Sequence, residues 1–267
     1  MDEIQESNEI FHEVWAMYAQ GLGGEVVEKP GLVAAWAGVQ WPMVNVVFLA
    51  GPIQNVFQLR SRLDSVAVYT KGKKQFGMLV ACDSWLPSTR TEVAALFNEY
   101  GWVQISEGAG MLCEKPTAEV SVQALEYRRV DSKELRQAAA DINAARYGVP
   151  AEMAREALDR EALGGEGCFG YVGYFNGQPV ATSTTYVRNG YLYVALVSTL
   201  PEFRSRSFAK AITIHSINEA SKRSGLQRTM LHATPMARSM YESLGFRTVT
   251  TFPMFLPVGL VAPAEAH

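Results

Sequence analysis

Three runs of strand-forming residues follow one another in the second half of the chain, and they constrain its fold most strongly. They cover Cys168–Phe175, Pro179–Val187 and Tyr191–Leu200, and are rich in aromatic and β-branched side chains. Asn176-Gly177 separates the first two runs, and Arg188-Asn189-Gly190 separates the last two. Asn-Gly is the strongest short hairpin signal, because a tight hairpin turn needs positive φ at both residues. The sequence therefore predicts an antiparallel meander.

The last of these runs leads through a compact turn into a helix, and such a junction suits an anion. Phe208 and Ile212 mark the apolar face of the helix. The N–H groups at a helix start have no intrahelical partner, and the helix dipole is positive there. Arg204 and Arg206 add fixed positive charge just before the helix. We therefore expect residues 204–209 to bind a phosphate.

A second motif begins at Ala237, after a predicted strand over Arg228–His232. Ala237 and Tyr241 are four residues apart and share a helix face. Gly245, followed by an aromatic residue, suits the left-handed position that ends a helix. Taken alone, a tyrosine such as Tyr241 is more often a core aromatic near a helix end.

Together the two motifs resemble those of the GNAT superfamily of N-acetyltransferases. The family's cofactor loop reads Arg or Gln, two residues, Gly, one residue, then Gly or Ala. This chain supplies Arg204-Ser-Arg-Ser207-Phe-Ala209, with serine where glycine is usual. The second family pattern is Ala, three residues, Tyr, three residues, then Gly-Phe, which residues 237–246 match. The motifs occur in the family's order.

The remaining elements of the second half fit the same family order. A capping box with Asp131 as the cap predicts one helix, and Pro150 opens a second. With a strand over Val120–Val130, the order becomes strand, two helices, three antiparallel strands, helix, strand, helix, strand. We expect an α+β protein with a GNAT fold, in which a central, mixed but mostly antiparallel sheet has helices on both faces.

The first half contains a weak internal copy of the second. Met78–Ala81 parallels Met230–Ala233, and residues 95–102 parallel residues 239–246. Phe97 stands where Tyr241 carries a hydroxyl. The strand Val46–Ala50 leads into residues 51–57 without an arginine-rich loop. The alternative is that any unit of strand, helix, glycine and aromatic residue looks alike.

From this copy we expect a tandem protein with three parts. Residues 1–116 would form a degenerate, partial GNAT-like domain, residues 117–257 the catalytic domain, and residues 258–267 a flexible tail. The tail carries proline and alanine without a period.

Composition and charge restrict the partners. The net charge is −3 and the pI about 5.9, and there is no basic run, so we expect neither nucleic acid nor a membrane as partner. Cys82, Cys113 and Cys168 are odd in number and far apart, which favours reduced thiols over disulfides or a zinc site. Met1–Glu6 is acidic, the opposite of a signal peptide. We expect a cytoplasmic monomer or homodimer without a metal.

The resemblance implies acetyl-CoA as cofactor and attack of a neutral amine on its thioester. Backbone groups near Val197 and Thr199 would pair with the pantetheine arm, and an N–H there would polarise the thioester carbonyl. Tyr241 would protonate the departing thiolate. The implied cofactor-binding residues are Val197, Thr199, Arg204, Ser205, Arg206, Ser207, Phe208 and Ala209.

His232 is the leading candidate for the general base, because it ends a strand beside the expected cleft and histidine titrates near neutrality. The alternative is a packed, hydrogen-bonded histidine, which is our interpretation of His215 in the middle of a helix. A small-molecule amine is the default acceptor.

Two rival functions stay open at this point. One is a non-catalytic protein that binds or senses acyl-CoA, which the serine at position 207 favours. The other is an acyltransferase with another donor, such as a longer acyl-CoA or an aminoacyl-tRNA. The low basic charge argues against tRNA.

Overall fold

The structure is a computed structural model that describes residues 2–116, 120, 122, 125–161 and 164–260. The chain divides into two compact units. The N-terminal unit comprises residues 1–109 and 250–267, and the C-terminal unit comprises residues 110–249. Among the described residues, no helix is long and apolar enough to cross a membrane.

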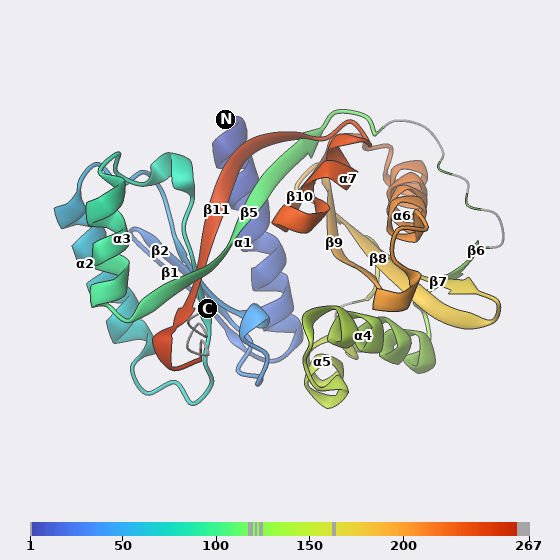
Figure 1. Cartoon of the computed structure of the whole chain (residues 1–267), viewed down its shortest axis with the longest axis horizontal. Coiled ribbons are helices and arrows are strands. Elements are labelled where there is room, and N and C mark those ends of the chain that lie inside the picture. Colours follow the sequence, from blue (N-terminus) through green and yellow to red (C-terminus); the bar gives the residue numbers. More distant parts are fainter. Residues whose placement is uncertain (1, 117–119, 121, 123–124, 162–163, 261–267) are drawn as a thin grey trace, which may run out of the picture. The chain divides into compact units, whose positions relative to one another are not determined.

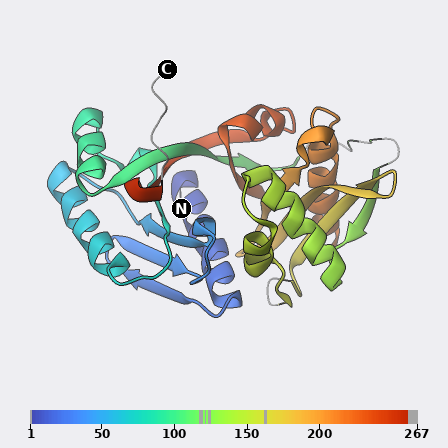
Figure 2. The ribbon, with the colours of Figure 1, turned by 60° about the horizontal axis from the view of Figure 1, so that its bottom comes forward.

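The C-terminal unit is a sheet with helices on both faces. Strands β6 to β9 pair in antiparallel order, and β10 runs parallel to β9. Helices α4 and α5 lie on one face of this sheet and α6 on the other, as the green and orange helices show (Figure 1; Figure 2). Its elements are β6 (Leu125–Arg129), α4 (Lys133–Tyr147), α5 (Ala151–Leu158), β7 (Cys168–Phe175), β8 (Gln178–Arg188), β9 (Tyr191–Thr199), α6 (Phe208–Ser224), β10 (Thr229–Ala233) and α7 (Arg238–Glu242).

The predicted meander is confirmed. Asn176 and Gly177 have φ of 51° and 77°, and Asn189 and Gly190 have φ of 46° and 80°. Positive φ at both central residues is the geometry that matches the twist of a two-residue hairpin. Asparagine and glycine supply it at little cost.

The capping residue of α4 differs from the sequence prediction. Ser132, not Asp131, is the N-cap, and its Oγ accepts a hydrogen bond from the N–H of Leu135 at 3.3 Å. Ser132 has the extended backbone of a cap, so its hydroxyl reaches the third N–H of the helix. The prediction of Asp131 as the cap was therefore wrong by one residue.

The N-terminal unit repeats the order of elements of the C-terminal unit. In each, three antiparallel strands are followed by a helix, a strand parallel to the third, a second helix and a long strand. The elements are α1 (Glu3–Gly21), β1 (Glu25–Lys29), β2 (Leu32–Trp36), β3 (Asn45–Leu49), α2 (Val56–Thr70), β4 (Met78–Val80), α3 (Arg90–Glu99), β5 (Trp102–Cys113) and β11 (Arg247–Pro257). This repetition is what an internal duplication would produce.

The long strands β5 and β11 each begin in one unit and end in the other. The sheet order is β1-β2-β3-β4-β11 in the N-terminal unit and β10-β9-β8-β7-β6 in the C-terminal unit, and both sheets are mixed but mostly antiparallel. The sequence predicts domains that divide between residues 116 and 117, whereas the compact units divide at residues 109/110 and 249/250. Residue 117 and most of the predicted tail lie outside the described residues, so the domain boundaries stay a prediction.

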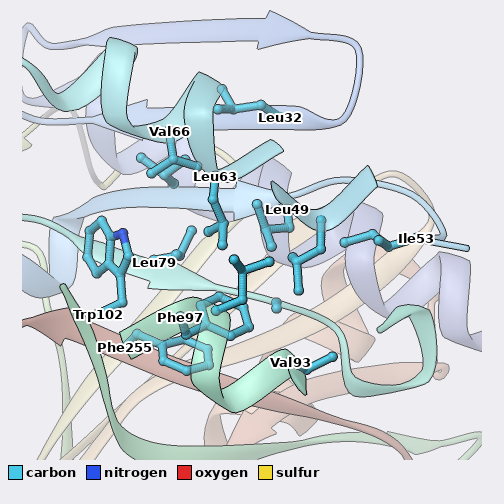
Figure 3. Close-up of a cluster of buried hydrophobic side chains, with 14 of the residues drawn as sticks. Leu32, Leu49, Ile53, Leu63, Val66, Leu79, Val93, Phe97, Trp102 and Phe255 are labelled. Atoms are coloured by element: carbon cyan, nitrogen blue, oxygen red, sulfur yellow. The ribbon is translucent and has the colours of Figure 1, made fainter. Parts of the chain in front are cut away.

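The core of the N-terminal unit contains Phe97, which the predicted internal copy aligns with Tyr241. Phe97 of α3 is buried, and its ring stacks on that of Phe255 of β11, with centroids 4.0 Å apart and planes 13° apart. Figure 3 shows the two rings beside Leu79 and Trp102 in a cluster of buried apolar side chains. Phe97 therefore serves the core.

Replacing Phe97 by alanine is expected to lower the free energy of unfolding by about 3–5 kcal/mol, because it empties a packed aromatic site. Phe57 in α2 is the matched control: its side chain is 86% exposed, so Phe57→Ala should change stability by less than about 0.5 kcal/mol. Urea unfolding would measure both. An equal loss of unfolding free energy in the two variants would contradict the placement of Phe97 in the core.

Candidate functional site

A cavity of about 440 Å³ opens in the C-terminal unit. It lies where the end of α4, the end of β9, the start of α6 and the region around α7 meet. Its lining residues are Arg146, Tyr147, Val197, Ser198, Thr199, Phe203, Arg204, Ser205, Ser207, Phe208, Ala209, Lys210, Thr234, Met236, Ala237, Met240 and Tyr241. The structure thus brings together most of the predicted site residues.

A break in the pairing of β9 forms one wall of this cavity. The register with β8 shifts between Thr182 and Thr184, and Leu196 has a φ of 54°. Such a bulge bends a strand and redirects its side chains. The register between β9 and β10 runs only from Leu192 to Val194 on β9. Beyond that point the two strands diverge, and residues 197–199 line the cavity.

A buried hydrogen bond holds the diverging end of β9. Ser198 Oγ donates to Asn143 Oδ1 at 2.7 Å, and Asn143 Nδ2 donates to the backbone oxygen of Ala139 at 2.9 Å. Both side chains are buried. The bulged strand is therefore fixed to α4 rather than left free to move.

The start of α6 forms the opposite wall, and its backbone donors have no side-chain cap. Ser207 is the N-cap, but its side chain makes no capping hydrogen bond, and the first turn contains no acidic residue. The first N–H groups of a helix have no intrahelical partner. The N–H groups of Phe208, Ala209 and Lys210 therefore remain available beside the cavity.

The charges around the cavity favour an anion. Arg146, Arg204 and Lys210 line it, and no aspartate or glutamate does so among the described residues. This local excess of cations contrasts with a chain whose net charge is −3. Arg206, which the sequence predicts to bind the cofactor, does not line the cavity. Its guanidinium lies 5.4 Å from the ring centroid of Phe203, so its role in binding stays a prediction.

The hydroxyl of Thr199 is a further feature of the site. Thr199 Oγ1 is buried and has no hydrogen-bond partner among the described residues. Burying a hydroxyl without a partner is unfavourable, because it loses its hydrogen bonds to water. Since Thr199 lines the cavity, a ligand could supply the missing partner.

Tyr241 of α7 is buried and lines the same cavity. Burial raises the pKa of its phenol above the usual range, because a phenolate would be poorly solvated there. The side chain is therefore a neutral proton donor across the physiological pH range.

His232 of β10 does not line the cavity. Its Nδ1 lies 2.9 Å from the hydroxyl oxygen of Tyr193, a buried residue of β9. His215 stacks on Tyr127 with ring centroids 4.1 Å apart and lies edge-on to Tyr171, which fits the structural role predicted for it.

Sequence reasoning missed several residues of the site. Arg146 and Tyr147 end α4, far from both motifs in the sequence, and no pattern in that helix singles them out. Lys210, one residue after the loop motif, could have been found from its charge and position. Met236 and Met240 lie next to residues of the second motif.

Comparisons with known proteins agree with this geometry. A family model described as an acetyltransferase (GNAT) domain matches residues 132–253. Among solved structures, the chain is similar to a GCN5-related N-acetyltransferase from Kribbella flavida, with a TM-score of 0.68 and 18% identity over 92% of this chain and 95% of that one. No curated protein matches the sequence significantly.

Two further solved structures resemble the chain. A GCN5-related N-acetyltransferase from Sphaerobacter thermophilus has a TM-score of 0.58 and 12% identity over 85% of this chain and 76% of that one. A tandem GNAT protein from the clavulanic acid biosynthesis pathway has a TM-score of 0.52 and 12% identity over 86% of this chain and 81% of that one.

These comparisons confirm the predicted fold: the chain has a GNAT-like fold that matches GNAT structures over most of its length. More specifically, residues 132–253 form a GNAT acetyltransferase domain. The resemblance recognised from residues 204–209 and 237–246 is thereby confirmed.

Replacing Ser207 by glycine is expected to raise the free energy of unfolding by about 0.5–1 kcal/mol. Ser207 has a φ of 62°, and this left-handed conformation costs a non-glycine residue about 1–2 kcal/mol, of which the extra chain entropy of glycine offsets about 0.5–1 kcal/mol. Ser61→Gly, on the exposed side of α2, is the control and should destabilise. Chemical unfolding would compare the free energies of unfolding of the two variants. A destabilised Ser207→Gly variant would refute the claim that the backbone of Ser207 is strained.

Proposed function

We propose that the C-terminal unit binds acetyl-CoA in the cavity beside α6 and transfers the acetyl group to the amine of a small molecule. The observation that carries the proposal is the uncapped start of α6 among three cations, Arg146, Arg204 and Lys210. Free N–H groups at the positive end of a helix form a natural phosphate site. Two structural neighbours bear the name N-acetyltransferase, which supports the reaction class.

The corresponding helix of the N-terminal unit, α2, has a side-chain cap at its start. Asn55 Oδ1 accepts the N–H of Gln58 at 3.0 Å, and Gln58 Oε1 accepts the N–H of Gln54 at 2.8 Å. The side chain of Arg62 donates to the backbone oxygens of Gly51 and Pro52 in the preceding loop. Unlike α6, α2 therefore has a side-chain cap at its start, and Arg62 occupies carbonyl groups of the loop before it, which supports a single CoA site per chain.

The diverging end of β9 suits the pantetheine arm. Backbone groups of residues 197–199 lie beyond the paired part of β9 and β10, so they can pair with an extended ligand as with a neighbouring strand. The buried hydroxyl of Thr199 adds one polar contact on the same wall. When bound there, acetyl-CoA would supply an activated acetyl group as a thioester.

Tyr241 is proposed as the general acid. As the amine nitrogen bonds to the acetyl carbon and the carbon–sulfur bond breaks, Tyr241 would give its phenolic proton to the departing sulfur. The proton lost by the attacking amine would restore the phenol, so the net products are an amide and the free thiol. A backbone N–H near Val197 would stabilise the negative charge that develops on the carbonyl oxygen.

His232 is proposed as the base that first accepts the proton of the amine, directly or through water, and then releases it, so that the same proton restores the phenol of Tyr241. Its hydrogen bond with Tyr193 has two possible directions. Only the tautomer in which Nδ1–H donates to the Tyr193 hydroxyl oxygen leaves Nε2 unprotonated and basic. Tyr193 would then orient the imidazole for this role.

Replacing Thr199 by valine should weaken CoA binding about 2- to 12-fold, because one neutral hydrogen bond contributes about 0.5–1.5 kcal/mol. Thr213→Val is a matched control, since Thr213 Oγ1 is also buried without a partner among the described residues but does not line the cavity. Neither substitution should lower the stability of the free protein. Isothermal titration with CoA would decide, and equal affinities in the two variants would argue against the contact.

Tyr241→Phe should leave CoA affinity and fold intact while it lowers kcat by about 100-fold or more, which corresponds to about 2.7 kcal/mol of barrier. The substitution keeps the ring and removes only the proton donor. Thiol release measured with chemistry rate-limiting, over a panel of small amines, provides the test. Wild-type turnover by Tyr241→Phe would remove the tyrosine from the mechanism. No turnover by the native protein with any amine, while CoA still binds, would favour a sensor.

His232→Ala should change the pH dependence of kcat/KM. A general base acts only when unprotonated, so the wild-type rate should fall on the acidic side, and this limb should disappear in the variant together with much of the rate. His215→Ala is the control, because His215 lies in the middle of α6 and stacks on Tyr127, and this variant should keep the acidic limb. An unchanged profile in His232→Ala would assign the base to another group.

A further inference from the structure

A second cavity, of about 360 Å³, opens in the N-terminal unit and shares no lining residue with the first. Its volume is within the range of small-molecule sites. One face of α1 together with its N-cap forms one side, and the segments that follow β3 and β4 form the other. The lining residues are Asp2, Gln5, Asn8, Glu9, His12, Ala50, Gly51, Pro52 and Trp85.

The chemistry of this cavity is opposite to that of the first. Two carboxylates, Asp2 and Glu9, line it, and no lysine or arginine does so among the described residues. Burial lowers the pKa of His12 to about 4, so its imidazole is uncharged at neutral pH and adds no positive charge. An anionic ligand such as CoA is therefore disfavoured, and a cation is favoured.

Two polar groups in the cavity have capacity for a ligand. His12 Nε2 is buried and has no hydrogen-bond partner among the described residues, although its ring is fixed against Phe48 with centroids 4.5 Å apart. Glu9 is exposed, and its Oε1 accepts a hydrogen bond from Gln5 Nε2 at 2.8 Å. Glu9 and His12 are three residues apart on α1, so they are neighbours on its surface.

We propose that this cavity binds a small organic molecule with a primary ammonium group. The ammonium would donate to the carboxylate of Glu9 and to Nε2 of His12, with the imidazole proton on Nδ1. Trp85 lines the same cavity and offers an aromatic surface to the organic part of the ligand. A primary ammonium has three donors and a positive charge, which match an acceptor nitrogen beside a carboxylate.

Isothermal titration of the chain of residues 1–267 with 2-phenylethylamine, in saturating CoA, tests the proposal. The neutral isostere 2-phenylethanol is the matched ligand control. We expect saturable binding of the amine and at least about 10-fold weaker binding of the alcohol, because a charge-assisted hydrogen bond is lost. Absence of saturable amine binding, or equal affinities of the two compounds, would overturn the proposal.

Three variants locate the binding. Glu9→Gln should weaken the amine about 10-fold or more, whereas Glu28→Gln, an exposed residue of β1 outside the cavity, should not. His12→Phe should weaken binding while the melting temperature is kept or raised, because the variant removes a buried nitrogen that has no partner. Unchanged amine affinity in Glu9→Gln and His12→Phe would place the amine elsewhere and refute the site.

The test of amine binding in the N-terminal unit can succeed or fail independently of the function proposed for the C-terminal unit. Glu9→Gln should leave acetyl transfer and CoA affinity unchanged, since Glu9 does not line the CoA cavity. Conversely, Thr199→Val should not change the affinity for 2-phenylethylamine.

Discussion

The proposed cofactor site depends on backbone donors at the start of α6 that the chain itself leaves without a cap. Most helices satisfy such donors with a side chain, but Ser207 makes no capping bond here and adopts a left-handed conformation instead. The bulge in β9 opens the adjoining sheet at the same place, because pairing with β10 ends at Val194. Strain in the loop and a broken strand ladder are local costs, and together they leave donors available for a ligand.

The two units show how one order of elements can serve different purposes. In the N-terminal unit, Asn55 and Gln58 cap the corresponding helix, and Arg62 ties the preceding loop to it. Phe97, which the predicted internal copy aligns with Tyr241, stacks in the core. In the N-terminal unit a side chain therefore caps the helix start, whereas the start of α6 in the C-terminal unit has no side-chain cap and lies beside a cavity. The cavity beside α1 is lined by carboxylates, whereas the cavity beside α6 is lined by arginine and lysine.

Much of the C-terminal fold could be predicted, because local signals specify it. The two Asn-Gly turns set the meander, and the motifs at residues 204–209 and 237–246 located most of the cavity. Features that depend on distant contacts could not be predicted. Arg146 and Tyr147 reach the site only because α4 packs on β9. No sequence pattern marks the points within β5 and β11 at which the two units divide. The pairing of His232 with Tyr193 likewise requires the register of two strands.

Isothermal titration of the chain of residues 1–267 with CoA, repeated for Arg204→Ala, tests the central claim most directly. Arg60→Ala is the control, because Arg60 is exposed, pairs with Glu99 on the N-terminal unit and does not line the cavity. A single CoA site at α6 predicts one CoA per chain, with affinity about 10-fold weaker in Arg204→Ala, as expected for a lost charge-assisted contact, and unchanged in Arg60→Ala. Two CoA molecules per chain, or unchanged affinity in Arg204→Ala, would contradict the account.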